Sequence, residues 1–166
     1  FIVDKEQAGV TIDFFEDKMG LRGTLTSNLK LKDVVVPNSA IVGTQGKGLR
    51  LALKTLTVGR VTVAAQSTGL ARAAYEAAAR WAVARKAFGS AIADHQAIGF
   101  KLADMVTELS AARMMTFESA RAYDRGEDIA SLGTMSKLFA SEAAHRIANQ
   151  AVQDRKSTRL NSSHVA

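Results

Sequence analysis

The spacing of hydrophobic positions changes once along the chain. Before residue 43 the pattern is short and strand-like: apolar runs stand at residues 1–3 and 34–36, and apolar and polar side chains alternate at residues 10–12 and 29–32. Alternation is typical of β-strands, because successive side chains of a strand point to opposite faces. We therefore expect a few strands in this part of the chain, too few to close a sheet by themselves.

From about residue 49 the hydrophobic spacing becomes helical. Three long segments, at about residues 49–84, 96–124 and 129–153, carry apolar residues at intervals of three and four. The second segment shows the pattern in Ile98, Leu102, Met105, Leu109 and Ala112. Three apolar stripes can only be buried against one another, so the pattern predicts antiparallel packed helices in a mainly α protein.

Two positions mark the expected helix ends. Gly126 is expected to end the second helix, and the acidic residues at 127 and 128 favour the start of the third through the helix dipole. Asp94 is expected to cap the start of the second helix. Residues 85–95 then form a corner between the end of one helix and the start of the next.

Composition excludes several kinds of site and partner. The 166 residues include no cysteine, so disulfides and thiolate chemistry are excluded, and the three histidines lie too far apart for metal-ligand spacing. We expect no metal. The net charge of +6 is spread among acidic residues, which favours a solvated surface over a nucleic-acid partner. No apolar run approaches the roughly 18 residues of a membrane span.

The corner itself allows two interpretations. Arg85 beside a helix start suits a phosphate or pyrophosphate, Phe88 could stack on a flat ring, Gly89 allows close approach, and Gln96 could hydrogen-bond the edge of the ring. Alternatively, Arg85 and Lys86 only favour the end of a helix, Phe88 fills the bundle, and Gly89 is a C-cap. Spacing alone leaves both interpretations open.

Five segments carry more specific motifs. They are EDKMGLRG at 16–23, VVVPNSAIVG at 34–43, GKGLRLALKTLTVGR at 46–60, RKAFGSAIADHQAIGFKLADM at 85–105 and KLFASEAAHRIANQAVQ at 137–153. In order and spacing they resemble the acyl-CoA dehydrogenases, which are FAD-dependent flavoproteins. The resemblance implies that residues 1–42 end a middle β-domain. Residues 43–153 would form an incomplete four-helix bundle with three of its helices, in a fragment of such an enzyme.

The resemblance implies an oxidoreductase that converts an acyl-CoA thioester to the 2-enoyl-CoA. A carboxylate would remove the α-proton while the β-hydrogen leaves as hydride to the flavin. Most family members place that glutamate well beyond the third helix, in a segment absent from this sequence. A minority place it just before the arginine of the first bundle helix, where this sequence has Gly59. No catalytic base is therefore assigned. We expect the chain alone to be inactive. The alternatives are a related flavoprotein, of acyl-CoA oxidase or nitroalkane oxidase type, and a non-catalytic helical interaction module.

The same resemblance assigns the site residues. Arg85, Phe88 and Gln96 match positions that bind the ADP half of FAD across a subunit interface. Gln153 matches the first residue of a further flavin-nucleotide motif. Arg60 matches an arginine that orders the active site. Thr57 matches a substrate contact that is commonly acidic in relatives, which leaves the acyl-chain preference open.

The resemblance also implies partners and a location. They are an acyl-CoA substrate, a homotetramer or homodimer formed through the helical bundle, and electron-transfer flavoprotein as electron acceptor. The location would be the bacterial cytoplasm, or the mitochondrial matrix in a eukaryote. Residues 154–166, DRKSTRLNSSHVA, resemble translated adapter or vector sequence, lack any apolar period, and are predicted to be a disordered tail.

Overall fold

The structure, a computed structural model, describes residues 1–160 in two compact units. The first unit ends at Ala52 and the second begins at Leu53. This boundary lies inside the first helix, later than the predicted end of the β-domain at residue 42. The first turns of that helix belong to the first unit, where Leu51 lies within 3.6 Å of a Cβ placed on Gly43.

A two-stranded antiparallel sheet forms the centre of the first unit. Strand β1 (Val10–Phe15) pairs with β2 (Ser27–Leu31), with Val10 opposite Leu31 and a register shift between Ile12 and Phe15. A short 3-10 helix, η1 (Asn38–Ala40), follows. The strands at residues 10–12 and 29–32 were predicted from the alternating pattern, whereas the apolar runs at residues 1–3 and 34–36, also expected to be strand-like, form no strand.

Gly9 allows the chain to enter this sheet. Its φ is +90°, and a Cβ at this position would lie 2.1 Å from the carbonyl oxygen of Lys32. The Gly9 carbonyl accepts a hydrogen bond of 2.9 Å from the Lys32 amide. A side chain here would meet rigid backbone, so the sequence needs glycine at this position.

The sheet has no core of its own. No residue from 1 to 52 is buried, and the side chain of Phe15 is 52% exposed and that of Leu29 61% exposed. Two strands with an uncovered apolar surface are not expected to be stable alone. This agrees with the expectation that the strands cannot close a sheet.

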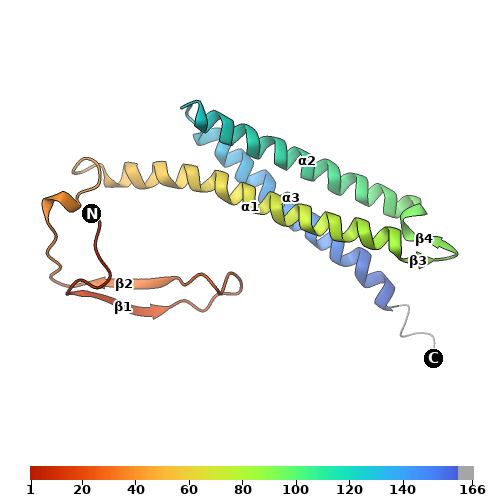
Figure 1. Cartoon of the computed structure of the whole chain (residues 1–166), viewed down its shortest axis with the longest axis horizontal. Helices are drawn as coiled ribbons and strands as arrows, with labels where there is room; N and C mark the ends of the chain where they lie inside the picture. Colours follow the sequence, from red (N-terminus) through yellow and green to blue (C-terminus); the bar gives the residue numbers. More distant parts are fainter. Residues whose placement is uncertain (161–166) are drawn as a thin grey trace. The chain divides into compact units, whose positions relative to one another are not determined.

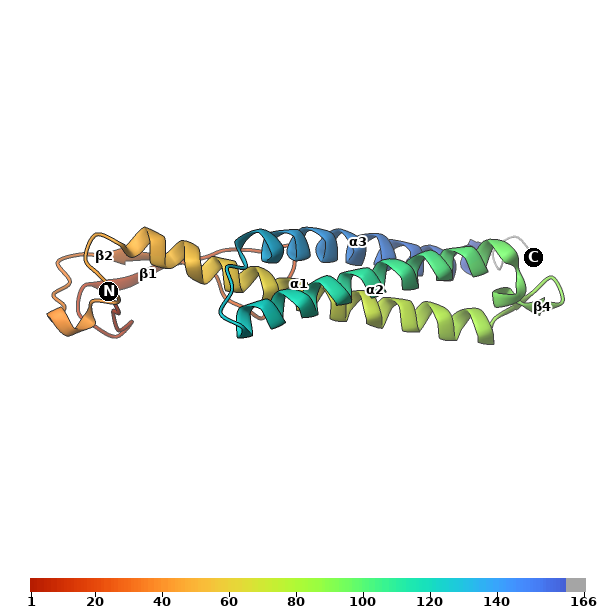
Figure 2. The same cartoon turned by 90° about the horizontal axis from the view of Figure 1, so that it is seen from above.

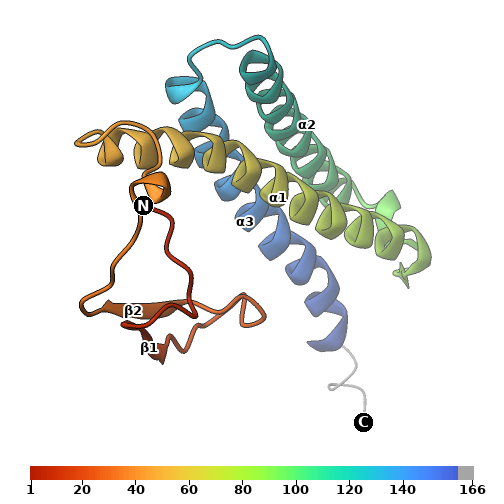
Figure 3. The ribbon, with the colours of Figure 1, turned by 60° about the vertical axis from the view of Figure 1, so that its left-hand side comes forward.

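Three long helices form the second unit, with the first turns of α1 left to the first unit (Figure 1). They are α1 (Gly48–Ala84), α2 (Gln96–Asp124) and α3 (Ala130–Leu160). The chain reverses direction at each connection, and α2 and α3 lie side by side (Figure 2). Helix α1 crosses α3 (Figure 3). The predicted fold class, mainly α with three long helices preceded by a few strands, is confirmed.

Small side chains fill the core between the helices. Helix α1 contributes an alanine every seven residues, at 64, 71 and 78. Met105, Leu109 and Ala112 come from α2, as their spacing predicted, and α3 adds Ala140, Ala143, Ile147 and Ala151. The largest fully buried side chain is Ile147, followed by two serines. Small core residues let helix backbones approach one another closely.

The helix ends agree with the sequence in two of three places. Gly126 ends the turn after α2 with a φ of +76°, as expected. The carboxylate of Asp128 accepts a hydrogen bond of 3.0 Å from the Ala130 amide at the start of α3. The expected cap at Asp94 is wrong, because His95 is the N-cap residue of α2 and no side chain caps this end.

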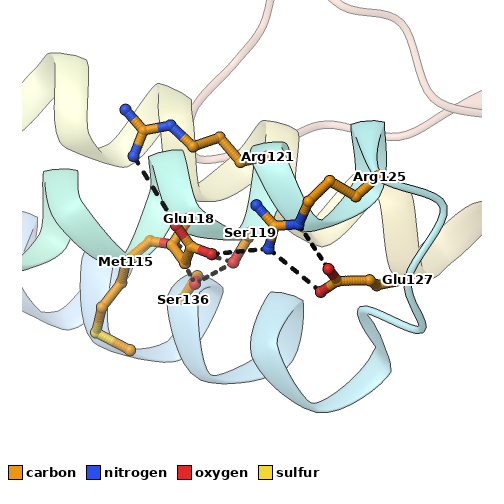
Figure 4. A network of polar contacts seen from close by, with 7 residues as sticks. All are labelled: Met115, Glu118, Ser119, Arg121, Arg125, Glu127 and Ser136. Carbon is orange, nitrogen blue, oxygen red and sulfur yellow. Dashed lines mark hydrogen bonds and ion pairs between the residues drawn. The ribbon is translucent and has the colours of Figure 1, made fainter.

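A buried polar contact joins α2 to α3 near their shared turn (Figure 4). The Oγ atoms of Ser119 and Ser136 lie 2.6 Å apart, and both lie 3.0 Å from the Met115 carbonyl oxygen. Both serines are fully buried. The two hydroxyls supply two protons for these three contacts. One proton can join the two hydroxyls and the other can reach the carbonyl oxygen, so all three groups are satisfied without water.

On the outside of the same turn, Arg125 holds two carboxylates (Figure 4). Its Nε donates to Glu127 across 2.6 Å, and its Nη2 donates to Glu118 across 2.9 Å. The hydrogen bond from Arg125 lowers the pKa of Glu127. Because these groups are exposed, the pairs orient the turn more than they stabilise it.

Helix α3 runs farther than the sequence indicated. It continues past Gln153 to Leu160, so the disordered tail predicted from residue 154 does not begin there. Asp154 is only 4% exposed, and its carboxylate lies 3.2 Å from Nζ of Lys101 on α2. A buried carboxylate with a cationic partner belongs to the packed unit. The remainder of the predicted tail, residues 161–166, lies outside the described residues.

Candidate functional site

The corner between α1 and α2 is a short β-hairpin. Arg85 closes the last turn of α1, its amide donating to the Trp81 carbonyl across 2.8 Å. Strand β3 (Lys86–Ala87) then pairs with β4 (Ser90–Ala91), and the 3-10 helix η2 (Ile92–Asp94) leads into α2. The Arg85 carbonyl accepts a hydrogen bond of 2.8 Å from Ile92, which closes the base of the hairpin.

Phe88 and Gly89 form the two-residue turn of this hairpin. Their φ angles are +53° and +87°, and tight hairpin turns of this kind need positive φ at both central residues. The ring of Phe88 is 92% exposed. The simple helix-end interpretation of the corner is therefore wrong in two respects. Phe88 does not fill the bundle, and Gly89 is a turn residue rather than the C-cap of α1.

His95 fastens the hairpin to the start of α2. Its Nε2 lies 3.1 Å from the Ala87 carbonyl oxygen, and its ring meets that of Phe88 edge-on, with centroids 6.1 Å apart and planes at 80°. Reasoning from the sequence did not single out His95, because its role depends on a hairpin that the alternation of apolar residues does not reveal. Its place directly before Gln96 was the available signal.

Arg85 and Gln96 stand on either side of the hairpin with exposed side chains. Gln96 is the first residue of α2, where backbone amides of the first turn lack partners within the helix. Among the residues whose side chains are described, the Arg85 guanidinium makes no hydrogen bond or ion pair. The corner thus combines an unpaired cation, an exposed aromatic ring and a helix N-terminus.

Gln153 lies at the same end of the helical unit. It is exposed on α3, directly before Asp154, and the ion pair of Asp154 with Lys101 ties this part of α3 to the early turns of α2. Figure 2 shows the hairpin at the same end of α1 and α2. Four of the six predicted site residues therefore gather at one end of the unit.

Arg60 and Thr57 lie at the other end, where α1 meets the start of α3. The Arg60 Nη1 donates to Oγ1 of Thr134 across 3.1 Å, and that Oγ1 donates to the Ala130 carbonyl across 2.6 Å. Thr57 is half-buried, with its hydroxyl turned back to the Leu53 carbonyl at 3.1 Å. Thr134 was missed, because nothing in its spacing distinguishes it from other helix threonines.

Gly133 lets α1 and α3 meet at this point. A Cβ placed on it would lie 3.4 Å from Val61 and 3.5 Å from the Thr57 carbonyl oxygen, at the edge of ordinary contact. The residue is buried between the helices. The close approach brings Thr134 within reach of Arg60.

Two grooves follow the helices. The groove between α1 and α2 has a volume of about 400 Å³ and includes Leu109 and Phe117, with the Arg113 guanidinium 5.5 Å from the centre of the Phe117 ring. The groove between α2 and α3, of about 360 Å³, is lined mainly by residues with charged or amide groups and holds the ion pair of Arg146 with Glu108 at 3.0 Å. Neither groove includes the corner residues or Arg60.

Other kinds of site are not found in the described part of the chain. No group of three or more histidine or acidic side chains there could hold a metal ion. None of the described helices is long and apolar enough to cross a membrane. The site candidates are therefore the corner and the surroundings of Arg60.

Comparison with known proteins gives concordant results. The family model for the acyl-CoA dehydrogenase C-terminal domain matches residues 46–154. The chain is 46% identical to a 3-(aryl)acrylate reductase of Clostridium sporogenes, over 92% of this chain and 41% of that protein. It is 43% identical to the caffeyl-CoA reductase-Etf complex subunit CarC of Acetobacterium woodii, over 92% of this chain and 40% of that protein.

Solved structures show the same likeness. The structure of butyryl-CoA dehydrogenase from Megasphaera elsdenii superposes with a TM-score of 0.89 at 37% identity, covering 93% of this chain and 40% of that one. The chain thus spans about two fifths of the length of the relatives it matches. Because the family model covers more than half of the chain and the fold agrees, this chain belongs to the acyl-CoA dehydrogenase family.

Proposed function

We propose that this chain is part of an FAD-dependent enzyme that converts an acyl-CoA thioester to the 2-enoyl-CoA. The observation that carries the proposal is the corner, where an unpaired arginine and an exposed phenylalanine flank the start of a helix. Neither exposed side chain takes part in the core of this chain. Both suit a ligand that has an anionic part and a flat ring. The ADP half of FAD, the flavin cofactor of this family, has both.

The residues at the corner fit the ADP half of FAD. Arg85 would pair with the pyrophosphate through charge-assisted hydrogen bonds, aided by the amides at the start of α2. Phe88 would stack on the adenine, and Gln96 would hydrogen-bond its edge. Gln153 would contact the nucleotide from α3. The exposure of Phe88 and Arg85 supports contact with a nucleotide held by a neighbouring subunit.

Arg60 and Thr57 would serve the substrate end of the reaction. Thr134 holds the Arg60 guanidinium in one orientation through a hydrogen bond. Arg60 would therefore already be oriented to order the groups around the thioester. FAD, when bound, would accept the hydride that leaves the β-carbon. The α-proton needs a carboxylate base, and the residue before Arg60 is Gly59, so we assign that role to no residue of this chain.

A second candidate is the reverse reaction. Two of the relatives described above are named as reductases, one of 3-(aryl)acrylates and one of caffeyl-CoA. The same binding residues would then serve an enzyme that adds hydrogen to a conjugated double bond. The Etf complex named for the second relative supports electron-transfer flavoprotein as the redox partner in either direction.

Association and location complete the proposal. We expect a homotetramer or homodimer that meets through the helical bundle, because the corner residues face outward and would complete a site on another subunit. The enzyme would work in the bacterial cytoplasm, or in the mitochondrial matrix of a eukaryote. An oxidase-type flavoprotein of the same family stays an alternative for the electron acceptor.

The proposal is tested with a chimaera of the Megasphaera elsdenii butyryl-CoA dehydrogenase in which residues 1–153 of this chain replace the matching segment. We expect the chimaera to retain FAD, measured by flavin absorbance, and to reduce an artificial acceptor with butyryl-CoA. An aryl-acrylyl-CoA with a reduced dye tests the reverse direction. A folded chimaera without FAD would contradict the cofactor site, whereas one with FAD and neither activity would contradict only the reaction.

A further inference from the structure

Folding of this chain does not explain the conformation of Phe88. Its φ of +53° is strained for a residue that has a Cβ, and its ring, 92% exposed, gains almost nothing from burial. Asparagine or glycine would make the same turn with less strain. The strained and exposed ring therefore points to a contact outside this chain.

His95 contacts both this ring and the backbone of the hairpin. A carbonyl oxygen can only accept, so the bond of 3.1 Å to Ala87 requires a proton on Nε2 of His95. The same imidazole and the Phe88 ring meet in a T-shaped arrangement, with centroids 6.1 Å apart. One side chain thus contacts both the backbone of β3 and the residue at the hairpin tip.

The backbone of His95 belongs to the start of α2. Its carbonyl accepts hydrogen bonds from the Ile98 amide at 2.9 Å and the Gly99 amide at 3.1 Å. Gln96 follows it directly in the sequence. Through His95, the hairpin that carries Phe88 and the helix that carries Gln96 are joined at one residue.

We propose that His95 is a positioning residue that fixes the Phe88 ring relative to the Gln96 amide, so that both contact one flat base. The inference rests on the nucleotide site proposed above. Without the imidazole, the hairpin would keep its own short ladder, the Arg85–Ile92 closure and the buried Ile92 at its base, but its tip would lose the side-chain contacts that join it to the start of α2. The Phe88 ring and the Gln96 amide would then no longer be placed to contact the same base.

The test uses the full chain and ADP as the probe. ADP affinity is measured by calorimetry for the wild type, for His95→Ala, and for His95→Gln, which keeps a donor for the Ala87 carbonyl. His145→Ala is the matched control, since His145 bonds Asn149 on its own helix and touches no part of the hairpin. Nuclear Overhauser effects between the Phe88 ring and residue 95 or 96 report the geometry without ligand.

We expect His95→Ala to weaken ADP binding about tenfold, the effect of one lost hydrogen bond. His95→Gln should lie between the wild type and His95→Ala, and His145→Ala should bind as the wild type does. Equal affinity of the wild type and His95→Ala, or an equal loss in His145→Ala, would overturn the inference alone. A wild-type chain that keeps the hairpin geometry and self-associates, as judged by light scattering, but binds no ADP would instead overturn the nucleotide site.

If His95→Ala fails to fold, as judged by circular dichroism, the comparison of His95→Gln with the wild type decides. Weakened affinity together with a weakened contact from Phe88 to the start of α2 supports positioning by the His95 side chain, whereas affinity equal to that of the wild type would overturn the inference. Weakened affinity with an unchanged Phe88 contact would overturn the inference, because the ring would then be held in place without contributing to binding.

Discussion

Arg60 on α1 and Thr134 on α3 are 74 residues apart in sequence and joined by a hydrogen bond of 3.1 Å. The bond fixes a guanidinium that would otherwise sample many rotamers on an amphipathic helix. It also makes the orientation of Arg60 depend on how α1 and α3 pack.

We expect Thr134→Val to lower kcat/KM of the chimaera about three- to tenfold. Valine keeps the shape of threonine but removes the acceptor, and a typical hydrogen bond contributes about 0.5 to 1.5 kcal/mol. Thr107→Val is the matched control, because Thr107 is an exposed helix threonine that bonds only the Ala103 carbonyl on its own helix. An equal loss in both variants would mean that valine acts through helix stability alone.

We expect Arg85→Ala to weaken FAD binding by the chimaera roughly tenfold to a hundredfold. The expected loss is that of a charge-assisted bond worth about 1.5 to 3 kcal/mol. Arg85→Lys should recover only part of the affinity, because an ammonium lacks the guanidinium fork. Flavin fluorescence titration provides the measurement.

Arg80→Ala is the control for Arg85, since it removes the same charge from α1 one turn earlier, where Arg80 lies 3.7 Å from Glu76. If Arg85 were only a favourable residue at a helix end, Arg85→Ala would lower folding stability by at most about 1 kcal/mol and leave FAD affinity unchanged.

Replacing Ser136 with alanine should destabilise the chain by about 1 to 2 kcal/mol. The change removes the hydroxyl that contacts both the fully buried Ser119 hydroxyl and the Met115 carbonyl oxygen, so these groups lose one hydrogen-bond proton. The double variant Ser119→Ala/Ser136→Ala should lose less than the sum of the single variants, since the two hydroxyls satisfy each other. Urea unfolding followed by circular dichroism measures both. Ser110→Ala, at an exposed serine that bonds only Val106, should change little.

Glu127 gives a pH dependence with a defined sign. Its pKa is lowered by the hydrogen bond from Arg125, so its contribution to stability is present above the ordinary glutamate pKa of about 4.3. The contribution is lost as the pH falls through the lower value of the folded state. Thermal melts of the wild type and Glu127→Gln should therefore differ at pH 7 and converge in acid. A difference that stays constant down to pH 2 would contradict this account.

The sequence predicted the helices well and the corner poorly, for a physical reason. Met105, Leu109 and Ala112 repeat at helical intervals, and a buried stripe follows from that repeat whatever the helix packs against. The hairpin depends instead on two residues with positive φ, and Phe88 is an unusual choice for such a turn. The turn propensities of these residues therefore gave no indication of the hairpin.

Contacts between segments far apart in the sequence could not be predicted, for a similar reason. Asp154 reads as the first residue of a polar tail until Lys101 on another helix pairs with it. Thr134 resembles any helix threonine until α1 crosses beside it. The family resemblance singled out Arg85 and Phe88 as cofactor-binding residues, which stays a prediction, but it did not point to His95, which contacts the Phe88 ring.

The alanine-lined core reverses the usual expectation about mutation. Ala64, Ala71 and Ala78 leave little side chain to remove, so truncation in α1 can open only small cavities. Added methylenes would instead force the closely packed helices apart, and overpacking of this kind costs about 1 to 3 kcal/mol for each site. Random variation should therefore harm this unit chiefly where it enlarges a side chain, and separation of α1 from α3 would release Arg60 from Thr134 at the same time.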